Sequence, residues 1–276
     1  MSVLSKLVSR YPKLCAKLSG EFLVPINSSA QKSTAPTSMI PPIVYQTWEI
    51  KQLGKSHAKE VERFHNLNPE LSFVIFDWVE RDAYMKSAWG QHPIFEIYQK
   101  SLFGPMKVDI FRYCILFEKG GFYFDINKGI TEPIKHFVKP ASEALISYEQ
   151  DIVHLPIASN IFPLLQHPHN VILNWGLGFV AGHPFTKRVI DNICLNYSSF
   201  QNQIFKKPSQ GIVKFTGPVM LTHSIHQVLQ EQPLLKFEQA GINFDGKGIT
   251  NMKGSWVRYM VSPAYTSIRS CEILSK

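Results

Sequence analysis

The stretch from residue 107 to residue 127 reads KVDIFRYCILFEKGGFYFDIN, and it decides the fold around it. Its first part places apolar residues at helical spacing, which predicts a helix over 106–119. The glycine pair Gly120 and Gly121 is a typical helix terminator. The aromatic run that follows predicts a short strand over 122–125. The stretch is therefore expected to form a helix, a tight turn and a strand in direct succession.

Four polar side chains in this stretch are candidates for chemistry. Asp109 and Arg112 are three residues apart, so they share one face of the predicted helix. Asp125 and Asn127 are two residues apart at the exit of the strand, so they point to the same side. Oxygen-bearing groups of this kind are what a hard cation such as Mg²⁺ or Mn²⁺ requires. Taken alone, the first pair also fits an ion pair on a helix surface, and the second fits an ordinary turn.

Strands and helices alternate on both sides of this stretch. We expect strands at 43–46, 71–76, 122–125, 144–148 and 175–181, and helices at 57–67, 80–89, 94–102, 106–119, 184–195 and 219–229. The run LSFVIF at 71–76 is typical of a strand buried on both faces. This alternation predicts an α/β fold with a mostly parallel sheet flanked by helices. Ligands of such sheets lie beyond the carboxyl ends of the strands, which selects 47–48, Asp77 and 125–127 as site positions.

The composition narrows the class of partner. Hydrophobic residues make up 45% of the 276 residues and charged residues 18%, so a sizeable core is expected. The formal net charge of +8 favours anionic partners. Because the basic residues are spread along the chain, with no dense basic run and no zinc-finger spacing, we expect no nucleic acid partner. Phosphate-bearing small molecules and acidic membrane surfaces are the remaining anionic partners.

The cysteines indicate the compartment. Cys15, Cys114, Cys194 and Cys271 stand far apart and form no CxxC pair, so neither a disulfide scaffold nor a metal framework is expected. Cys114 lies in an apolar helical run, where a buried and inert thiol is the ordinary case. A reducing compartment fits this usage. No apolar run reaches the roughly 18 residues of a membrane span. We therefore expect a cytoplasmic protein.

The N-terminal segment has a pattern of its own. Residues 1–20 place apolar residues at helical spacing with basic residues between them and no acid, which resembles an interfacial amphipathic helix. Pro12 is expected to kink or split that helix. The pattern fits peripheral contact with a membrane, a partner, or docking on the protein's own domain. The polar segment 27–38, NSSAQKSTAPTS, is typical of a linker. We therefore expect an N-terminal segment at 1–38 and the main domain at 39–276.

Three further blocks accompany the stretch at 107–127 in a fixed order. They are IPPIVYQTW at 40–48, NWGLGFVAGHPF at 174–185 and FTGPVMLT at 215–222, followed by Gly254, Ser255 and Trp256. The ordered set resembles the glycosyltransferases whose sugar-binding region contains a DXD motif. This family includes the yeast initiating α-1,6-mannosyltransferase and bacterial capsular polysaccharide enzymes. The resemblance covers about residues 40 to 256.

The resemblance implies a GT-A fold and transfer from a nucleotide-sugar, UDP- or GDP-linked, with retention of the anomeric configuration. By the same resemblance, Trp48 would stack on or flank the nucleotide base, and core packing is its alternative. Asp109 would bind sugar hydroxyls, and Arg112 would bind the sugar or phosphate because a guanidinium fork suits bidentate oxygen recognition. Asn174 would lie beside the reacting sugar and position the substrate.

The diphosphate end of the donor carries two departures from the family pattern, at Asn127 and at Asn251, which stands near the place of the family's C-terminal histidine. Asp125 and Asn127 would hold the ribose and the metal-diphosphate, and Ser255 and Trp256 would close over it. The family's second aspartate is Asn127 here, and a neutral amide oxygen binds Mn²⁺ or Mg²⁺ more weakly. Lys128 follows directly, and its charge could neutralise part of the diphosphate. We therefore expect weaker metal dependence than the family norm.

Three functions fit these observations. The first is a retaining transferase that adds a hexose or hexosamine to a glycan, a polysaccharide precursor or a lipid-linked saccharide. The second keeps the chemistry and modifies a protein acceptor, as effector and toxin transferases do. The third is a nucleotide-sugar or carbohydrate-binding homologue made inactive by the change at Asn127. For retention, a front-face reaction assisted by the leaving phosphate fits better than double displacement, since no carboxylate nucleophile stands out.

Overall fold

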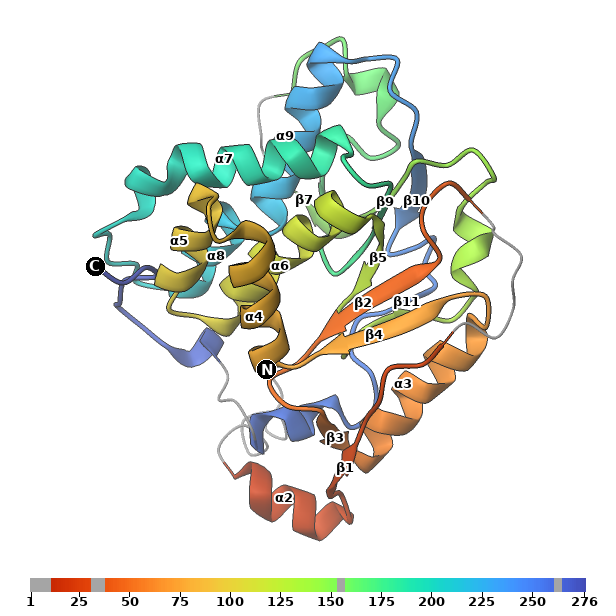
Figure 1. Ribbon diagram of the computed structural model, residues 1–276, viewed down its shortest axis with the longest axis vertical. Helices are drawn as coiled ribbons and strands as arrows, with labels where there is room; N and C mark the ends of the chain where they lie inside the picture. The colour runs from red at the N-terminus through yellow and green to blue at the C-terminus, as the bar shows by residue number, and fades with distance from the viewer. Residues whose placement is uncertain (1–10, 31–37, 153–156, 261–264) are drawn as a thin grey trace.

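The centre of the protein is a seven-stranded sheet in the computed structural model, which describes residues 11–30, 38–152, 157–260 and 265–276 (Figure 1). The strands run in the order β10-β7-β9-β5-β2-β4, with β8 beside β7. Their bounds are β2 (Ile43–Thr47), β4 (Ser72–Phe76), β5 (Gly121–Phe124), β7 (Ala144–Ile152), β8 (Asn170–Ile172), β9 (Gly176–Phe179) and β10 (Glu238–Ile242). Neighbouring strands are parallel except where β8 or β9 takes part. The predicted α/β fold with a mostly parallel sheet is confirmed.

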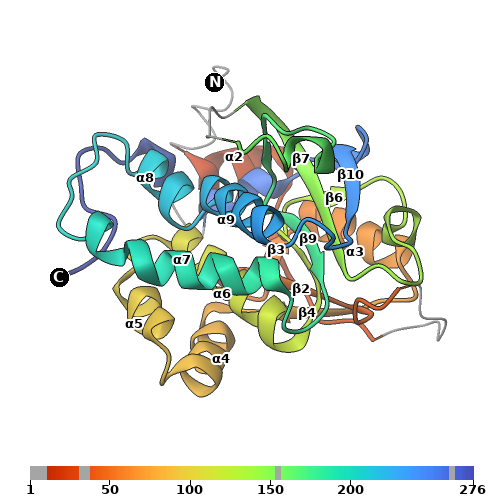
Figure 2. The same ribbon diagram turned by 90° about the horizontal axis from the view of Figure 1, so that it is seen from above.

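Helices cover both faces of this sheet (Figure 2). Helix α3 (Lys55–Leu67) lies on one face. The other face carries α4 (Trp78–Trp89), α5 (Pro93–Lys100), α6 (Gly104–Lys119), α7 (Pro184–Phe200), α8 (Pro208–Phe215) and α9 (Pro218–Glu231). Side chains alternate along each strand, so Val44 packs in the α3 core while Tyr45 packs in the larger helical core. The sheet therefore separates two hydrophobic cores.

The strand predicted at 71–76 differs from expectation in its burial. Phe73 and Ile75 are 1% exposed, whereas the residues between and beside them are half-buried. The prediction that both faces are buried is therefore wrong. The reason is position, because β4 is the edge strand and only its α3 side is fully covered.

The glycine pair shapes the turn between α6 and β5. Gly120 has φ 65° and Gly121 has φ 105°, values that side chains rarely tolerate. A Cβ atom on Gly121 would lie 2.7 Å from a methyl group of Ile43 on β2, so the turn passes too close to the sheet for any side chain. This close passage sends β5 into the middle of the sheet and brings Asp125 to its carboxyl end.

Short elements surround the sheet. They are α2 (Pro12–Ser19), β1 (Leu23–Pro25), β3 (Gln52–Gly54), β6 (Gly129–Ile130), β11 (Gly248–Ile249) and the 3₁₀ turns η1 (Ile134–Phe137), η2 (Phe162–Leu164), η3 (Ser255–Met260) and η4 (Tyr265–Ser267). Strand β1 pairs with β3, and Ser29 forms a bridge to Phe73 of β4.

Part of the N-terminal prediction lies outside the described residues, namely 1–10 of the amphipathic segment and 31–37 of the linker. The division between 1–38 and 39–276 stays a prediction. Among the described residues, none of the helices is both long and apolar enough to span a bilayer.

Candidate active site

Three charged side chains meet at the carboxyl end of β5. Arg112, from the middle of α6, places Nη2 2.9 Å from Oδ1 of Asp125, which follows β5 directly. The same nitrogen lies 3.4 Å from Oδ1 of Asp109, one turn earlier on α6. The side chains of Arg112 and Asp109 are 4% and 8% exposed, whereas that of Asp125 is 25% exposed. The cluster is therefore closed toward the helix and open at Asp125.

Asp109 is fixed by two further donors from distant parts of the chain. Asn174 Nδ2 donates to Oδ1 of Asp109 at 2.9 Å, and Thr216 Oγ1 donates to Oδ2 at 3.0 Å. Arg112 also donates to the backbone carbonyl of Asn174. Burial raises the pKa of Asp109 to about 7, while Arg112, Thr216 and Asn174 act in the opposite direction. The carboxyl group therefore titrates near neutral pH with its orientation fixed.

Aromatic side chains form the floor of the cluster. The guanidinium carbon of Arg112 lies 4.5 Å from the ring centroid of Tyr123, a cation–π contact. The hydroxyl groups of Tyr113 and Tyr123 are buried and have no hydrogen-bond partner among the described residues. Burial, the largest cause, raises the pKa of both hydroxyls well above its usual range. These buried hydroxyls are therefore neutral, and a buried environment strengthens the charge interactions beside them.

The turn after β5, formed by Asp125, Ile126 and Asn127 and called the D-I-N turn below, is held from two sides. Lys128 N donates to the carbonyl of Asp125 at 2.9 Å and closes the turn. The buried His57, at the start of α3, places Nε2 2.9 Å from the carbonyl of Ile126. Burial lowers the pKa of His57 to about 4, so the imidazole is neutral at physiological pH and donates this hydrogen bond. Met252 N donates to the carbonyl of Asn127 at 2.8 Å from the opposite side.

The predicted closing residues lie on η3, next to this turn. Ser255 is 2% exposed and its hydroxyl donates to Oδ1 of Asn251 at 2.9 Å. Arg258 Nη1 lies 3.2 Å from the same hydroxyl and 3.4 Å from Oδ1 of Asn251. Trp256 is half-buried. Lys128 Nζ donates to the carbonyl of Thr250 at 3.0 Å, so the segment that leads into η3 is attached to the D-I-N turn.

Trp48 and Asp77 follow neighbouring strands, as predicted, but differ in role. Trp48 is half-buried behind β2, packs against the α3 core, and donates its backbone N–H to the carbonyl of Phe76. No hydrogen bond between described residues joins it to the Asp109 cluster. Asp77 is the N-cap of α4 and forms a capping box with Glu80, which accounts for its carboxylate structurally.

Comparison with known proteins bears on this cluster directly. Residues 54–149 match the model of the glycosyltransferase sugar-binding region containing the DXD motif. The region spans α3 through β7, so it contains Asp109, Arg112 and the D-I-N turn.

Curated relatives extend the match beyond the sugar-binding region at low identity. The initiation-specific α-1,6-mannosyltransferase of Candida albicans is 22% identical over 68% of this chain and 53% of its own length. The inositol phosphoceramide mannosyltransferase 3 of Schizosaccharomyces pombe is 23% identical over 67% of this chain and 45% of its own. This chain thus spans about half the length of the curated relatives it matches.

A solved structure supports the fold. The glycosyltransferase PaToxG superposes with a TM-score of 0.50 over 83% of this chain and 81% of its own, at 14% identity. The predicted GT-A-type fold around the sugar-binding region is confirmed.

The D-I-N turn fits a tightly held divalent cation poorly. It offers one carboxylate, Asp125, whose Oδ1 is already paired with Arg112, and one neutral amide at Asn127. In the described part of the chain, no three His, Cys, Asp or Glu side chains gather into a group that could hold a metal ion. Mg²⁺ at phosphate sites is usually bound by one or two carboxylates together with substrate phosphates, and here the single carboxylate is already paired with a guanidinium. The Mg²⁺ or Mn²⁺ site at Asp125 and Asn127 stays a prediction.

Four residues join the site that the sequence did not single out: Thr216, His57, Arg258 and Glu149. Thr216 belongs to the FTGPVMLT block at 215–222. The sequence marked this block by its resemblance to the family but assigned no function to Thr216. Glu149 lies on β7, and burial raises its pKa while Lys128 lowers it. No local sequence pattern marks His57 or Arg258. His57 contacts Ile126, which is 69 positions away, and Arg258 lies on a short 3₁₀ turn.

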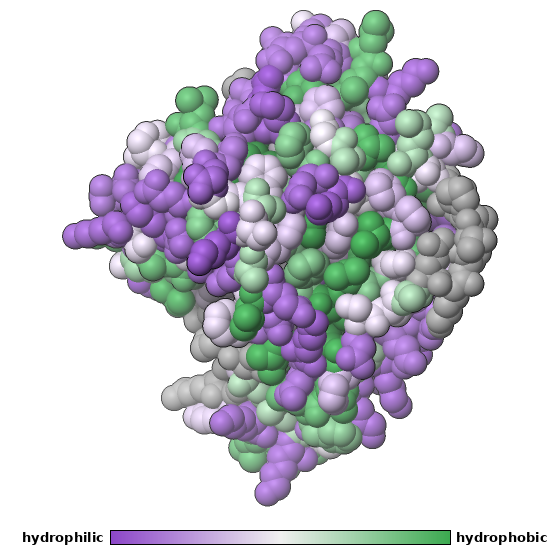
Figure 3. Space-filling model, in the orientation of Figure 1, coloured by the Kyte–Doolittle hydropathy of each residue, from purple (hydrophilic) through white to green (hydrophobic). Residues whose placement is uncertain are grey.

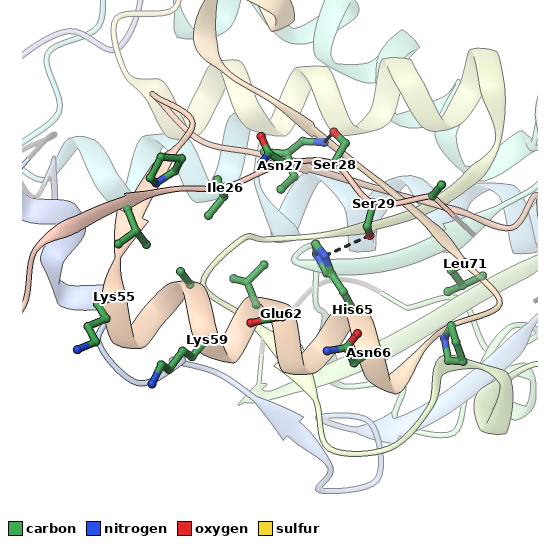
Figure 4. Close-up of a pocket in the computed structure, with 17 residues that line it drawn as sticks. Ile26, Asn27, Ser28, Ser29, Lys55, Lys59, Glu62, His65, Asn66 and Leu71 are labelled. Carbon is green, nitrogen blue, oxygen red and sulfur yellow. Dashed lines mark hydrogen bonds between the residues drawn. The ribbon is translucent and has the colours of Figure 1, made fainter. Parts of the chain in front are cut away.

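A cavity among the described residues lies elsewhere. It has a volume of about 540 Å³ and is lined by residues 24–30 and by the side of α3 (Figure 4). Lys55, Lys59 and Glu62 stand at the helix side, and Ser29 Oγ lies 3.4 Å from Nδ1 of His65. None of the predicted site residues lines this cavity. The candidate active site is therefore distinct from this pocket.

Proposed function

We infer that this protein is a retaining glycosyltransferase that transfers a hexose or hexosamine from a nucleotide-sugar to a glycan or polysaccharide precursor. The observation that carries the proposal is the Asp109–Arg112–Asp125 cluster at the carboxyl end of β5, inside the sugar-binding region. Ligands of open α/β sheets bind at this edge. The open side at Asp125 leaves room for a donor, while the closed side holds the groups that would orient it.

The geometry supports a division of roles within the donor site. Asp109, Arg112 and Asn174 form the catalytic group, in which Asp109 accepts sugar hydroxyls and Arg112 meets the phosphate or sugar. Trp48 provides an aromatic surface for the base. The residues that would contact the diphosphate lie on the D-I-N turn and on the segment attached to it. They are Asp125, Lys128, Ser255 and Trp256.

The reaction is front-face substitution at the anomeric carbon. Asp109 is the carboxylate that we assign to the sugar, and it already accepts hydrogen bonds from Thr216 and Asn174 and faces Arg112. A carboxylate engaged on both oxygens is a weak nucleophile. The chain's contribution is therefore to position the donor and to stabilise charge on the leaving diphosphate. The leaving phosphate removes the proton from the acceptor hydroxyl.

The acceptor is a glycan or lipid-linked saccharide, and the enzyme acts in the cytoplasm at a membrane surface. Helix α2 supports this placement. Leu14 and Leu18 are 56% and 79% exposed on one side of it, and Lys13 and Lys17 are exposed beside them. Figure 3 shows apolar and hydrophilic residues side by side at this end of the molecule. An exposed apolar stripe with flanking lysines suits an acidic lipid surface.

A thermal-shift screen against UDP-sugars and GDP-sugars tests the proposal. A ligand that binds only the folded state raises the melting temperature. We expect one nucleotide class to raise it, and Asp125→Asn to abolish the shift while keeping the shape of the site. The control is Asp191→Asn, which removes an exposed carboxylate paired only with Lys187 on α7. Hydrolysis of the same donor then separates an active enzyme from a binding protein. The proposal fails if no donor of either class shifts the wild-type protein.

A further inference from the structure

One short segment of the chain joins the D-I-N turn to two cations. Met252 N holds the carbonyl of Asn127 at 2.8 Å. Two residues earlier, the carbonyl of Thr250 accepts from Lys128 Nζ at 3.0 Å. The next residue, Asn251, lies 3.4 Å from Arg258 Nη1 through its Oδ1. Because these three attachment points are consecutive, the ends of both cationic side chains lie close to the turn.

Neither of these two cations is held in an ion pair by the described residues. In the described ranges, Lys128 and Arg258 form no ion pair within 4.0 Å, and the hydrogen bonds of their tips go to carbonyl, amide and hydroxyl groups. Glu149 acts on Lys128 electrostatically without forming an ion pair with it. Both cations are half-buried, and each lies against an aromatic ring: Lys128 Nζ is 5.3 Å from the centroid of Trp175, and Arg258 faces Tyr259. Partly desolvated, unpaired cations bind phosphate more strongly than exposed ones do.

The oxygen set of the same turn is deficient for a metal. Asp125 is paired with Arg112, and Asn127 carries no charge. A divalent cation at a DXD motif would neutralise the diphosphate. Where that cation is weakly held, other groups must neutralise the negative charge of the diphosphate. Building on the proposed function, we propose that Lys128 and Arg258 neutralise the donor diphosphate, and that a nucleoside diphosphate binds this site without a divalent cation. The planar fork of Arg258 suits two phosphate oxygens, and Lys128 acts as a point charge.

Calorimetric titration of the full chain with UDP and with GDP tests the proposal, in excess EDTA and again with Mn²⁺. We expect one nucleotide to bind in EDTA with a dissociation constant within about threefold of its value in Mn²⁺. Binding in EDTA should weaken as salt increases, because the contacts are between charges. These measurements use the unaltered protein and do not depend on any variant folding.

Charge-removing variants then locate the effect. Arg258→Gln and Lys128→Gln should each weaken binding in EDTA at least about tenfold, which is about 1.4 kcal/mol. Arg63→Gln is the matched control, since it removes an equal charge from a side chain that is 76% exposed on α3, and it should leave binding unchanged. Arg258→Lys and Lys128→Arg should recover part of the loss. Asn127→Asp should weaken binding in EDTA and make it respond to Mn²⁺.

The outcomes separate the two proposals. Binding that appears only with Mn²⁺ overturns the cationic site and leaves the proposed function intact. Binding in EDTA that survives both Arg258→Gln and Lys128→Gln, in folded variants with wild-type melting temperatures, overturns the assignment of these residues. An absence of binding by either nucleotide in both conditions overturns the donor site itself, and the cationic site with it.

Discussion

The hydroxyl group of Thr216 offers the sharpest test of how the buried cluster is held together. It donates to Oδ2 of Asp109 at 3.0 Å, and both residues are buried. Thr216→Val keeps the shape and removes this hydrogen bond together with a longer one of 3.5 Å to the carbonyl of Ile212. A hydrogen bond to a charged group contributes about 1.5–3 kcal/mol, against about 1 kcal/mol for a neutral one. We therefore expect Thr216→Val to lower the free energy of unfolding by about 2 kcal/mol when Asp109 is ionised.

The loss should depend on pH, with a sign that follows from Asp109. Its pKa is about 7 in the folded protein and about 3.9 in an unfolded chain, so the folded state holds the proton more tightly. The contribution of Asp109 to stability is full below about pH 4 and is lost as pH rises to 7. The Thr216 hydroxyl stabilises the ionised form and lowers this pKa. Removing the hydroxyl should therefore destabilise by about 1 kcal/mol at about pH 5.5 and about 2 kcal/mol at about pH 8.5.

Urea unfolding followed by circular dichroism measures both values. Thr186→Val is the matched control, because Thr186 is equally buried and its hydroxyl donates at 2.8 Å to the carbonyl of His183, a neutral group. That variant should lose about 1 kcal/mol at both pH values. Equal losses for Thr216→Val at the two pH values, or the same pH dependence in Thr186→Val, would refute the reasoning.

Three further changes test other parts of the structure. Gly121→Ala should destabilise by about 2–4 kcal/mol in urea unfolding, whereas Gly182→Ala, whose Cβ meets no atom within 4 Å, should lose about 1–2 kcal/mol. Leu18→Ser should weaken cosedimentation with phosphatidylserine vesicles about tenfold, and Leu195→Ser, equally exposed on α7, should not. His57 has a pKa of about 4, so its contribution to stability is lost as pH falls from about 6.5 to 4, and His57→Gln should flatten that part of the urea profile.

Each of these has a contrary outcome. Similar losses for Gly121→Ala and Gly182→Ala would show that the close passage at β2 is not the constraint. Unchanged vesicle binding by Leu18→Ser would remove α2 from the membrane proposal. An unaltered acid limb in His57→Gln would mean that His57 titrates normally in the folded protein.

Most regular elements could be predicted from local sequence, and the exceptions share a cause. Helix α6 and strand β5 follow from apolar spacing and a glycine pair. Strand β10, EQAGI, was missed because it is short, polar at its start and interrupted at Gly241, and it is a strand only through pairing with β7. Helix α8, PSQGIVKF, has eight residues and an internal glycine, which weakens any helical signal.

The contacts of the candidate site are of two kinds: those visible in the local sequence and those that only the tertiary fold creates. Asp109 and Arg112 share a helix face, so their proximity is visible three residues apart in the sequence. That Thr216 completes the same carboxylate depends on a contact across 107 positions, which no periodicity encodes. The positions of Lys128 and Arg258 likewise depend on their hydrogen bonds to residues 250–252, which pack against the D-I-N turn. Local pattern therefore finds the groups on one element, and only the tertiary fold shows which groups complete them.

The attachment of residues 250–252 to the D-I-N turn has a consequence for the order of assembly. Strands β2, β4 and β5 all lie within the first half of the chain, and they can pair as soon as it is made. Contacts between residues far apart in sequence form late, because a long loop must close first. During synthesis the carboxyl ends of these strands would therefore be in place before residues 250–258 bring Arg258 to the D-I-N turn. We expect the ability to hold a donor to arise in the last stage of folding, after most of the hydrophobic core is in place.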